Sequence, residues 1–108
     1  MDEPVLALST WPADLDLVPL AQDLVSAGVA ACVSILPAVQ SVYIWQGAVQ
    51  SEREQQLLIK TTRGQVGALW QALRARHPYD VPEFIVVPIV DGNPEYLDWI
   101  RRAVTPRA

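Results

Sequence analysis

The chain is poor in the residues that most often build disulfides, metal centres and acid–base sites. Among 108 residues there is one cysteine, Cys32, and one histidine, His77. A single cysteine cannot form an internal disulfide, which suits a reducing compartment and predicts a cytoplasmic protein. The chain also offers no HExxH sequence, Ser-His-Asp set or paired-carboxylate motif. We therefore expect no catalytic residues and no enzymatic activity.

Basic residues are also scarce. Eight Lys and Arg residues stand against twelve Asp and Glu residues, for a net charge of −4. Nucleic-acid binding needs a basic surface that neutralises phosphates, and the densest basic group here is Arg74, Arg76 and His77. A glycine-rich phosphate loop is missing as well. We expect no nucleic-acid partner and no organic cofactor.

Long apolar runs and targeting segments are missing too. The best apolar run, residues 84–90, is far shorter than the ~20 residues that span a bilayer. The first residues, Met1-Asp2-Glu3-Pro4, are acidic and lack the basic and then apolar build of a signal peptide. The sequence predicts no membrane partner.

What the chain does have is apolar surface, gathered in a long strand pattern. Half of its residues, 51%, are hydrophobic, and four of them are Trp, which a single domain of this size cannot easily bury. Residues 30–45 alternate like one strand, which would extend roughly 50 Å, and Gln46-Gly47 predicts a turn after it. A domain of this length has a radius of gyration near 13 Å. The hairpin must bend, overhang or meet another subunit, so we expect an oligomer.

The order of elements predicts an α+β fold in one domain, residues 1–108. The expected elements are a strand at 5–10, a helix capped by Asp14 or Asp16 and ended at Gly28, the long hairpin returning through 55–62, a helix at 64–76, a strand at 84–90 and a helix capped by Asn93. This β-α-β-β-α-β order with a short C-terminal helix is the ferredoxin-like arrangement, in which the second and fourth strands lie at the edges. Pro37 and Pro88 fall in those two strands, where a missing backbone N–H is tolerated.

Three residues are candidate metal ligands: Cys32, Glu54 and His77. With Gln46-Gly47 as the turn, Cys32 faces Thr61 and Glu54 faces Val39, which separates Cys32 from Glu54 by roughly 23 Å. The second helix should bring His77 to the level of Glu54, so these two form the better pair within one chain. Cys32 would need a ligand from elsewhere, such as another subunit.

Each candidate also has a simpler structural interpretation. Cys32 is a soft ligand for copper or zinc, yet a free cysteine on an apolar strand is more often a small buried hydrophobe. His77 ends a helix, where an imidazole can bond the last carbonyls, or it ligates a metal or a small molecule. A further prediction is an intersubunit pocket lined by Tyr43, Trp45, Tyr79 and Lys60. The alternative for the three aromatic residues is packing within a subunit interface.

Several segments together resemble the CutA family of divalent-cation tolerance proteins. They occur in order along nearly the whole chain: residues 31–33 and 35–37, Ser41, Tyr43, residues 45–47, 57–62, 77–79, 82–83, 92–93 and 96–99. The resemblance implies a ferredoxin-like subunit in a homotrimer whose long hairpins pair across subunits. It also implies a role in tolerance of copper and other divalent ions.

The chain departs from this family in one respect. Members with a proposed copper site have a cysteine at the position of Ser9 and a His-His pair where this chain has Arg76-His77. We therefore expect copper or another divalent cation to bind weakly. The alternatives are a PII-like small-molecule sensor, because the implied trimer resembles PII signalling proteins, and a scaffold trimer without catalytic activity.

Overall fold

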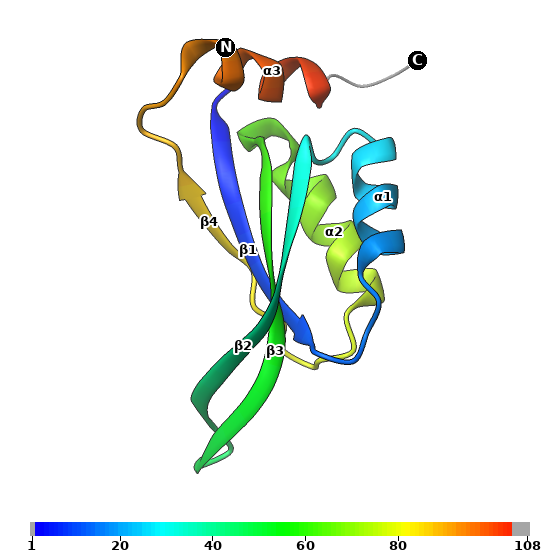
Figure 1. The fold of residues 1–108 in the computed structure, drawn as a ribbon, viewed down its shortest axis with the longest axis vertical. Helices are drawn as coiled ribbons and strands as arrows, with labels where there is room; N and C mark the ends of the chain where they lie inside the picture. The colour runs from blue at the N-terminus through cyan, green and yellow to red at the C-terminus, as the bar shows by residue number, and fades with distance from the viewer. Residues whose placement is uncertain (1, 105–108) are drawn as a thin grey trace.

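The computed structural model describes residues 2–104, whose elements follow the expected β-α-β-β-α-β order and end in a helix (Figure 1). In chain order they are β1 (Pro4–Pro12), α1 (Val18–Ser26), β2 (Cys32–Trp45), β3 (Ala48–Thr62), a short 3₁₀ helix (Arg63–Gln65), α2 (Val66–Arg76), β4 (Ile85–Pro88) and α3 (Pro94–Ala103). Within this range no helix is both long and apolar enough to cross a membrane.

The four strands form one antiparallel sheet in the order β2-β3-β1-β4. The central positions of β1 and β3 and the edge positions of β2 and β4 confirm the prediction from the prolines. Pro37 lies in β2 and Pro88 in β4, and proline at an edge removes no hydrogen bond from the interior of the sheet.

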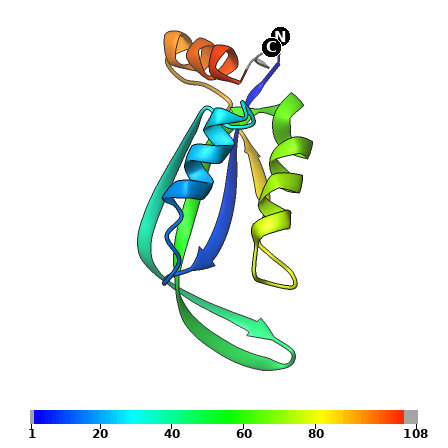
Figure 2. The same cartoon turned by 90° about the vertical axis from the view of Figure 1, so that its right-hand side faces the viewer.

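Helices α1 and α2 cover one face of the sheet (Figure 2). Alternate residues of the central strands, among them Ala7, Leu57 and Ile59, point into this layer and are fully buried. The two helices complete the core with leucines at helical spacing, Leu20 and Leu24 from α1 and Leu69 and Leu73 from α2. The core of the subunit therefore lies between these helices and one side of the sheet.

The hairpin of β2 and β3 continues well past the rest of the sheet (Figure 1). Pairing between β1 and β3 ends at Pro12 and Glu54, and beyond this point β2 and β3 pair with each other. We call residues 39–53 the arm. Its turn at Gln46 and Gly47 has two positive φ angles, 51° and 80°, as a tight two-residue hairpin turn requires. The arm gives the subunit a long axis of 44 Å, which confirms the expected overhang.

A bulge at the root of the arm changes the predicted register. Leu36 pairs with Gln56 and Val39 with Glu54, so Pro37 and Ala38 together face one residue of β3. The predicted pairing of Val39 with Glu54 is confirmed. The predicted pairing of Cys32 with Thr61 is wrong, because the extra residue shifts the inner half by one and Cys32 pairs with Lys60.

Helix boundaries agree with the sequence where a side chain caps the helix. Asn93 caps α3, and its Oδ1 accepts a hydrogen bond from the Glu95 N–H at 3.0 Å. For α1 the capping position is Leu17, one residue after the predicted Asp16, whose Oδ1 accepts from the Val18 N–H at 3.1 Å. The strand expected at residues 84–90 is shorter, Ile85–Pro88.

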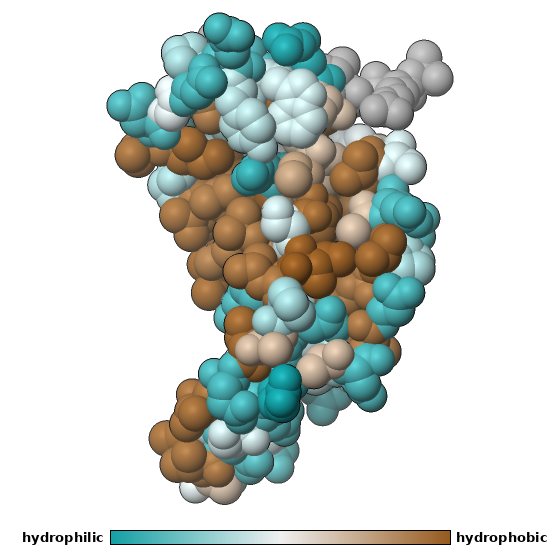
Figure 3. All heavy atoms as spheres, viewed as in Figure 1, coloured by the Kyte–Doolittle hydropathy of each residue, from teal (hydrophilic) through white to brown (hydrophobic). Residues whose placement is uncertain are grey.

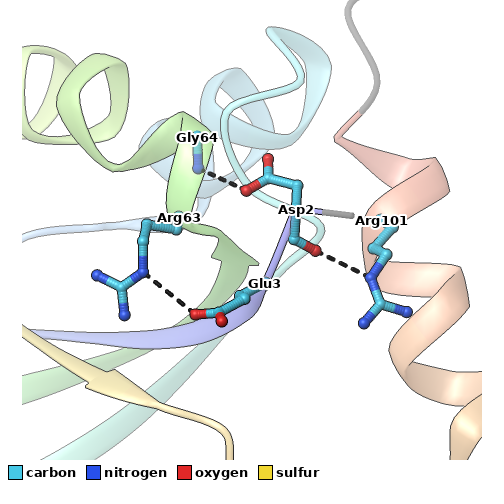
Figure 4. A network of polar contacts seen from close by, with 5 residues as sticks. All are labelled: Asp2, Glu3, Arg63, Gly64 and Arg101. Carbon is cyan, nitrogen blue, oxygen red and sulfur yellow. Dashed lines mark hydrogen bonds and ion pairs between the residues drawn. The ribbon is translucent and has the colours of Figure 1, made fainter.

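A polar cluster fastens the N-terminal segment to the 3₁₀ helix before α2 and to α3 (Figure 4). The Asp2 carboxylate accepts a hydrogen bond from the Gly64 N–H at 2.9 Å, and the Asp2 carbonyl accepts one from Arg101 Nε at 2.9 Å. Arg63 and Glu3 form an ion pair at 3.4 Å. The nearby Thr62 side chain and the hydrogen bond from the Gly64 N–H lower the pKa of Asp2, so this carboxylate stays charged. A side chain at position 64 would require the Asp2 carboxylate to move.

The second face of the sheet is largely apolar, and no helix of residues 2–104 forms a layer over it. Figure 3 shows apolar side chains gathered over the sheet and again at the end of the arm. By the strand register this open face presents Leu6, Leu8, Leu36, Leu58, Ile85 and Val87. They are half-buried or exposed in the single chain.

Candidate functional site

A cavity of about 810 Å³ lies between the arm and the loop that joins α2 to β4. One face of the arm contributes Ser41, Tyr43, Trp45 and Glu52, and Glu54 follows on the same face at the root of the arm. Thr10 and Val42 also line the cavity. The loop contributes Pro78, Tyr79, Asp80, Val81, Pro82 and Glu83. The prolines on either side of Tyr79 and Asp80 restrict the backbone of this loop, so the pocket has one wall of sheet and one of stiffened loop.

Glu54 stands at the inner end of this pocket, where β1 stops pairing with β3. Its side chain is only 4% exposed, and the Tyr79 hydroxyl donates a hydrogen bond to Glu54 Oε2 at 2.8 Å. Burial and the neighbouring Glu54 carboxylate both raise the pKa of Tyr79 well above its ordinary value. Tyr79 therefore remains a protonated donor throughout the physiological range.

His77 fixes the start of the loop to the sheet. Its Nδ1 accepts a hydrogen bond from the Tyr79 N–H at 3.1 Å, and its Nε2 lies 2.8 Å from the Thr10 carbonyl oxygen, to which it donates. The ring packs on Trp11, with ring centroids 4.0 Å apart. Burial lowers the pKa of His77, which favours the neutral imidazole that this bonding pattern needs. Both nitrogens are thus already engaged.

Cys32 lies at the opposite end of the hairpin. It pairs with Lys60, six residues from Glu54 along β3, or about 20 Å away. The thiol is partly buried, and its Sγ lies 4.0 Å from the Ser34 hydroxyl. The Lys60 ammonium donates to the Tyr96 hydroxyl at 2.9 Å, and this hydrogen bond raises the pKa of Lys60. Lys60 is thereby held on the open face, far from the pocket.

The structure brings two of the three predicted ligands together and leaves the third apart. Tyr79 links His77 to Glu54. Its ring centroid lies 4.7 Å from that of the imidazole, and its hydroxyl donates a hydrogen bond to the carboxylate. This agrees with the expected common level of His77 and Glu54. Within residues 2–104 no three or more Cys, His, Asp or Glu side chains gather in a way that could hold a metal ion. The role of these residues in metal binding stays a prediction.

Ser9, which stands where the resemblance places a cysteine in some relatives, has a structural partner. Its hydroxyl is buried and accepts a hydrogen bond from Trp11 Nε1 at 3.0 Å. This bond satisfies the indole N–H within the core, so the serine helps to position the ring that packs against His77.

The sequence-based reasoning missed Glu52 of the arm as a pocket residue, and it also missed two acidic residues of the loop, Asp80 and Glu83. Glu83 accepts a hydrogen bond from Gln56 Nε2 at 3.2 Å and so closes the loop onto β3. The signal that could have found the two loop residues is the Pro78–Pro82 spacing, which predicts a rigid loop directly after His77. Tyr43, Trp45 and Tyr79 line this pocket of the single chain, whereas Lys60 lies outside it. The pocket between subunits stays a prediction.

The fold defines a small α+β protein with an overhanging hairpin, and comparison with known proteins identifies its family. The model of the family described as "CutA1 divalent ion tolerance protein" matches residues 5–103. The "Divalent-cation tolerance protein CutA" of Thermus thermophilus is 45% identical over 101 residues, 94% of this chain and 96% of that protein. The "Protein CutA 1, chloroplastic" of Oryza sativa is 45% identical over 78% of this chain, which spans 48% of that longer protein.

Solved structures agree with this family match. The crystal structure of CutA from Xylella fastidiosa superposes with a TM-score of 0.89 at 42% identity, covering 95% of this chain and 99% of that one. The chain belongs to the CutA1 family of divalent ion tolerance proteins. The resemblance seen in the sequence is thereby confirmed. The family is named for ion tolerance and not for a catalysed reaction.

Proposed function

We propose that this chain forms a homotrimer that acts in tolerance of copper and other divalent ions, binding them weakly and catalysing no reaction. The observation that carries this proposal is the family match, which extends over residues 5–103. The relative from Thermus thermophilus, whose name refers to divalent cations, is similar along almost its entire length. The alternative, a PII-like small-molecule sensor or scaffold trimer, stays a prediction.

Two apolar surfaces support assembly into a trimer of ferredoxin-like subunits. One is the open face of the sheet. The other is the aliphatic face of the arm, formed by Val42, Ile44 and Val49, which are 67%, 73% and 72% exposed in the single chain. Exposed apolar patches of this kind on a small protein mark interaction surfaces. Pairing of arms between copies would bury them.

Weak metal binding is what the geometry around His77 would give. A metal ion at His77 must displace either the Tyr79 N–H from Nδ1 or the Thr10 carbonyl contact of Nε2. Glu54 is the neighbouring oxygen ligand, and its hydrogen bond from Tyr79 would also have to rearrange. Cys32 would bind a separate ion with ligands from another subunit, because it lies too far from Glu54 to share one.

Calorimetric titration with Cu(II), Cu(I) and Zn(II) tests the metal assignment. We expect weak Cu(II) and Zn(II) binding to the wild type that is further weakened in His77→Ala and Glu54→Gln. Cys32→Ser should affect Cu(I) most, because a thiolate is the softest ligand of the three. Glu95→Gln, an exposed change in α3, is the matched control. Identical isotherms for the wild type and His77→Ala would overturn the His77 assignment.

We also propose a cytoplasmic location, on the ground that a lone, partly buried thiol suits a reducing compartment. Fractionation of the source cells, with the protein detected by antibody, tests it. Recovery with the soluble cytoplasmic fraction is expected, and recovery in another compartment would contradict it.

A further inference from the structure

The pocket beside the arm has a charge of one sign. Four carboxylates line it, from Glu52, Glu54, Asp80 and Glu83. Among residues 2–104 no Lys, Arg or His side chain lines it, although acidic and basic groups are mixed over the rest of the chain. The potential inside the cavity is therefore negative, and low-dielectric walls strengthen such a field.

Glu54 is the carboxylate that most needs a positive partner. It is almost completely buried, and a buried charge is normally paired, because removing it from water costs several kcal/mol. The three ion pairs formed within residues 2–104 join Arg63 to Glu3, Arg76 to Asp23 and Arg101 to Asp98. None of them involves Glu54, which accepts a hydrogen bond from the neutral hydroxyl of Tyr79.

Three aromatic residues, Tyr43, Trp45 and Tyr79, line the same cavity. Apart from these rings and the four carboxylates, the lining residues are uncharged: Thr10, Ser41, Val42, Pro78, Val81 and Pro82. Aromatic faces attract cations, and Trp does so most strongly. Together, aromatic rings and carboxylates without a basic neighbour form an environment typical of organic ammonium recognition.

The size of the cavity separates an organic cation from a metal ion. Its volume of about 810 Å³ lies within the range of small-molecule sites, roughly 300–1,000 Å³. A single metal ion needs several ligands that converge on one point, and no such cluster of acidic, Cys or His side chains exists within residues 2–104. The carboxylates are instead spread around a space large enough for a molecule.

We propose that this pocket binds a small organic ammonium ion, held by the Glu52 and Glu54 carboxylates and by the rings of Tyr43 and Trp45. The proposal goes beyond the metal function above and does not depend on it. The opposite face of the arm carries Ile44 and Val49, while Val42 also borders the cavity.

Titration of the full chain with choline, followed by the indole N–H resonances in NMR spectra, tests the proposal. Choline is compared with its uncharged isostere, in which a quaternary carbon replaces the nitrogen. We expect a saturable shift of the Trp45 resonance and a small response from Trp99 on α3. The isostere should bind at least about tenfold more weakly, because it lacks the charge, and added salt should weaken choline binding.

Charge-removing variants locate the site. Glu54→Gln should weaken choline binding about tenfold. Because Glu54 is buried, Glu52→Gln provides the same test at an exposed position where folding is not at risk. Glu95→Gln is the control and should bind like the wild type. The proposal is overturned by an absence of saturable binding, by equal binding of the isostere, or by equal losses in Glu52→Gln and Glu95→Gln.

Discussion

The inner and outer halves of the β2–β3 hairpin carry similar side chains in opposite surroundings. In the inner half Leu57 and Ile59 are fully buried beneath α1 and α2, whereas in the arm Ile44 and Val49 are more than 70% exposed. Both pairs lie on strands with the same alternation. Apolar alternation therefore indicates which face of a strand favours burial. The position of the helices decides whether the same chain or another copy buries it.

The largest expected effect comes from the buried half. Ile59→Ala should lower the free energy of unfolding by about 2–5 kcal/mol, because it removes methyl groups from a closed core and leaves a cavity. Urea denaturation followed by circular dichroism measures this loss. Ile44→Ala is the matched change in the arm, and its smaller effect should shrink further on dilution, since it acts through assembly. Equal, dilution-independent losses would contradict the distinction between the two halves.

A charge on the aliphatic face of the arm should act on assembly instead. Ile44→Asp should weaken association of subunits by about 2 kcal/mol, or roughly thirtyfold, because an apolar contact is lost and a charge would be buried. Analytical ultracentrifugation over a range of concentrations measures it. Gln40→Asp, on the same face nearer the root, is a control with the same added charge. An unchanged oligomeric state in Ile44→Asp would contradict the proposed role of this face.

His77, which lies at the level where the two halves of the hairpin meet, should make the stability of the folded chain depend on pH. Burial holds the pKa of His77 below its ordinary value of 6.5 in the folded chain, so protonation favours the unfolded state. The stability that the neutral imidazole contributes is present above about pH 6.5 and is lost as the pH falls through the lowered pKa. Thermal unfolding of the wild type and of His77→Gln, compared from about pH 7.5 to about pH 5, isolates the contribution of His77 to the pH dependence of stability. The wild type should lose more stability on acidification, and parallel curves would contradict it.

The smallest effect is expected at the tip of the arm. Gly47→Ala should cost about 1 kcal/mol of backbone strain, because Gly47 has a φ of 80° while an added methyl group would meet no atom within 4 Å. Hydrogen exchange should show faster exchange of amides in the arm, with those of the core unchanged. A global loss of stability comparable to that of Ile59→Ala would show that arm and body unfold as one unit.

The sequence predicted those parts of the fold that depend on local chemistry. The Gln46-Gly47 turn, the Asn93 cap and the edge strands with proline follow from backbone angles and missing donors, which nearby residues determine. The bulge was not predictable in this way. It depends on how Pro37 and Ala38 fit against β3, and Ala38 adopts a positive φ of 60° that alanine alone would not favour.

The candidate site was predictable only in outline. The length of α2 placed His77 at the level of Glu54, but it did not indicate that Tyr79 bonds one and packs on the other. Nor did it indicate that both nitrogens of His77 are engaged. The acidic side chains of the loop meet those of the arm through tertiary contacts, and no spacing within the sequence encodes that meeting.

The bulge has a consequence for how the hairpin can change in length. It separates a half whose side chains are fixed by the helices from a half that extends freely. Two residues added to each strand beyond the bulge would increase the reach of the arm by roughly 7 Å and keep every side chain on its face. One residue added to each strand would exchange the aliphatic and aromatic faces of the tip. Among relatives, the strands of the arm should therefore differ in length by even numbers of residues per strand.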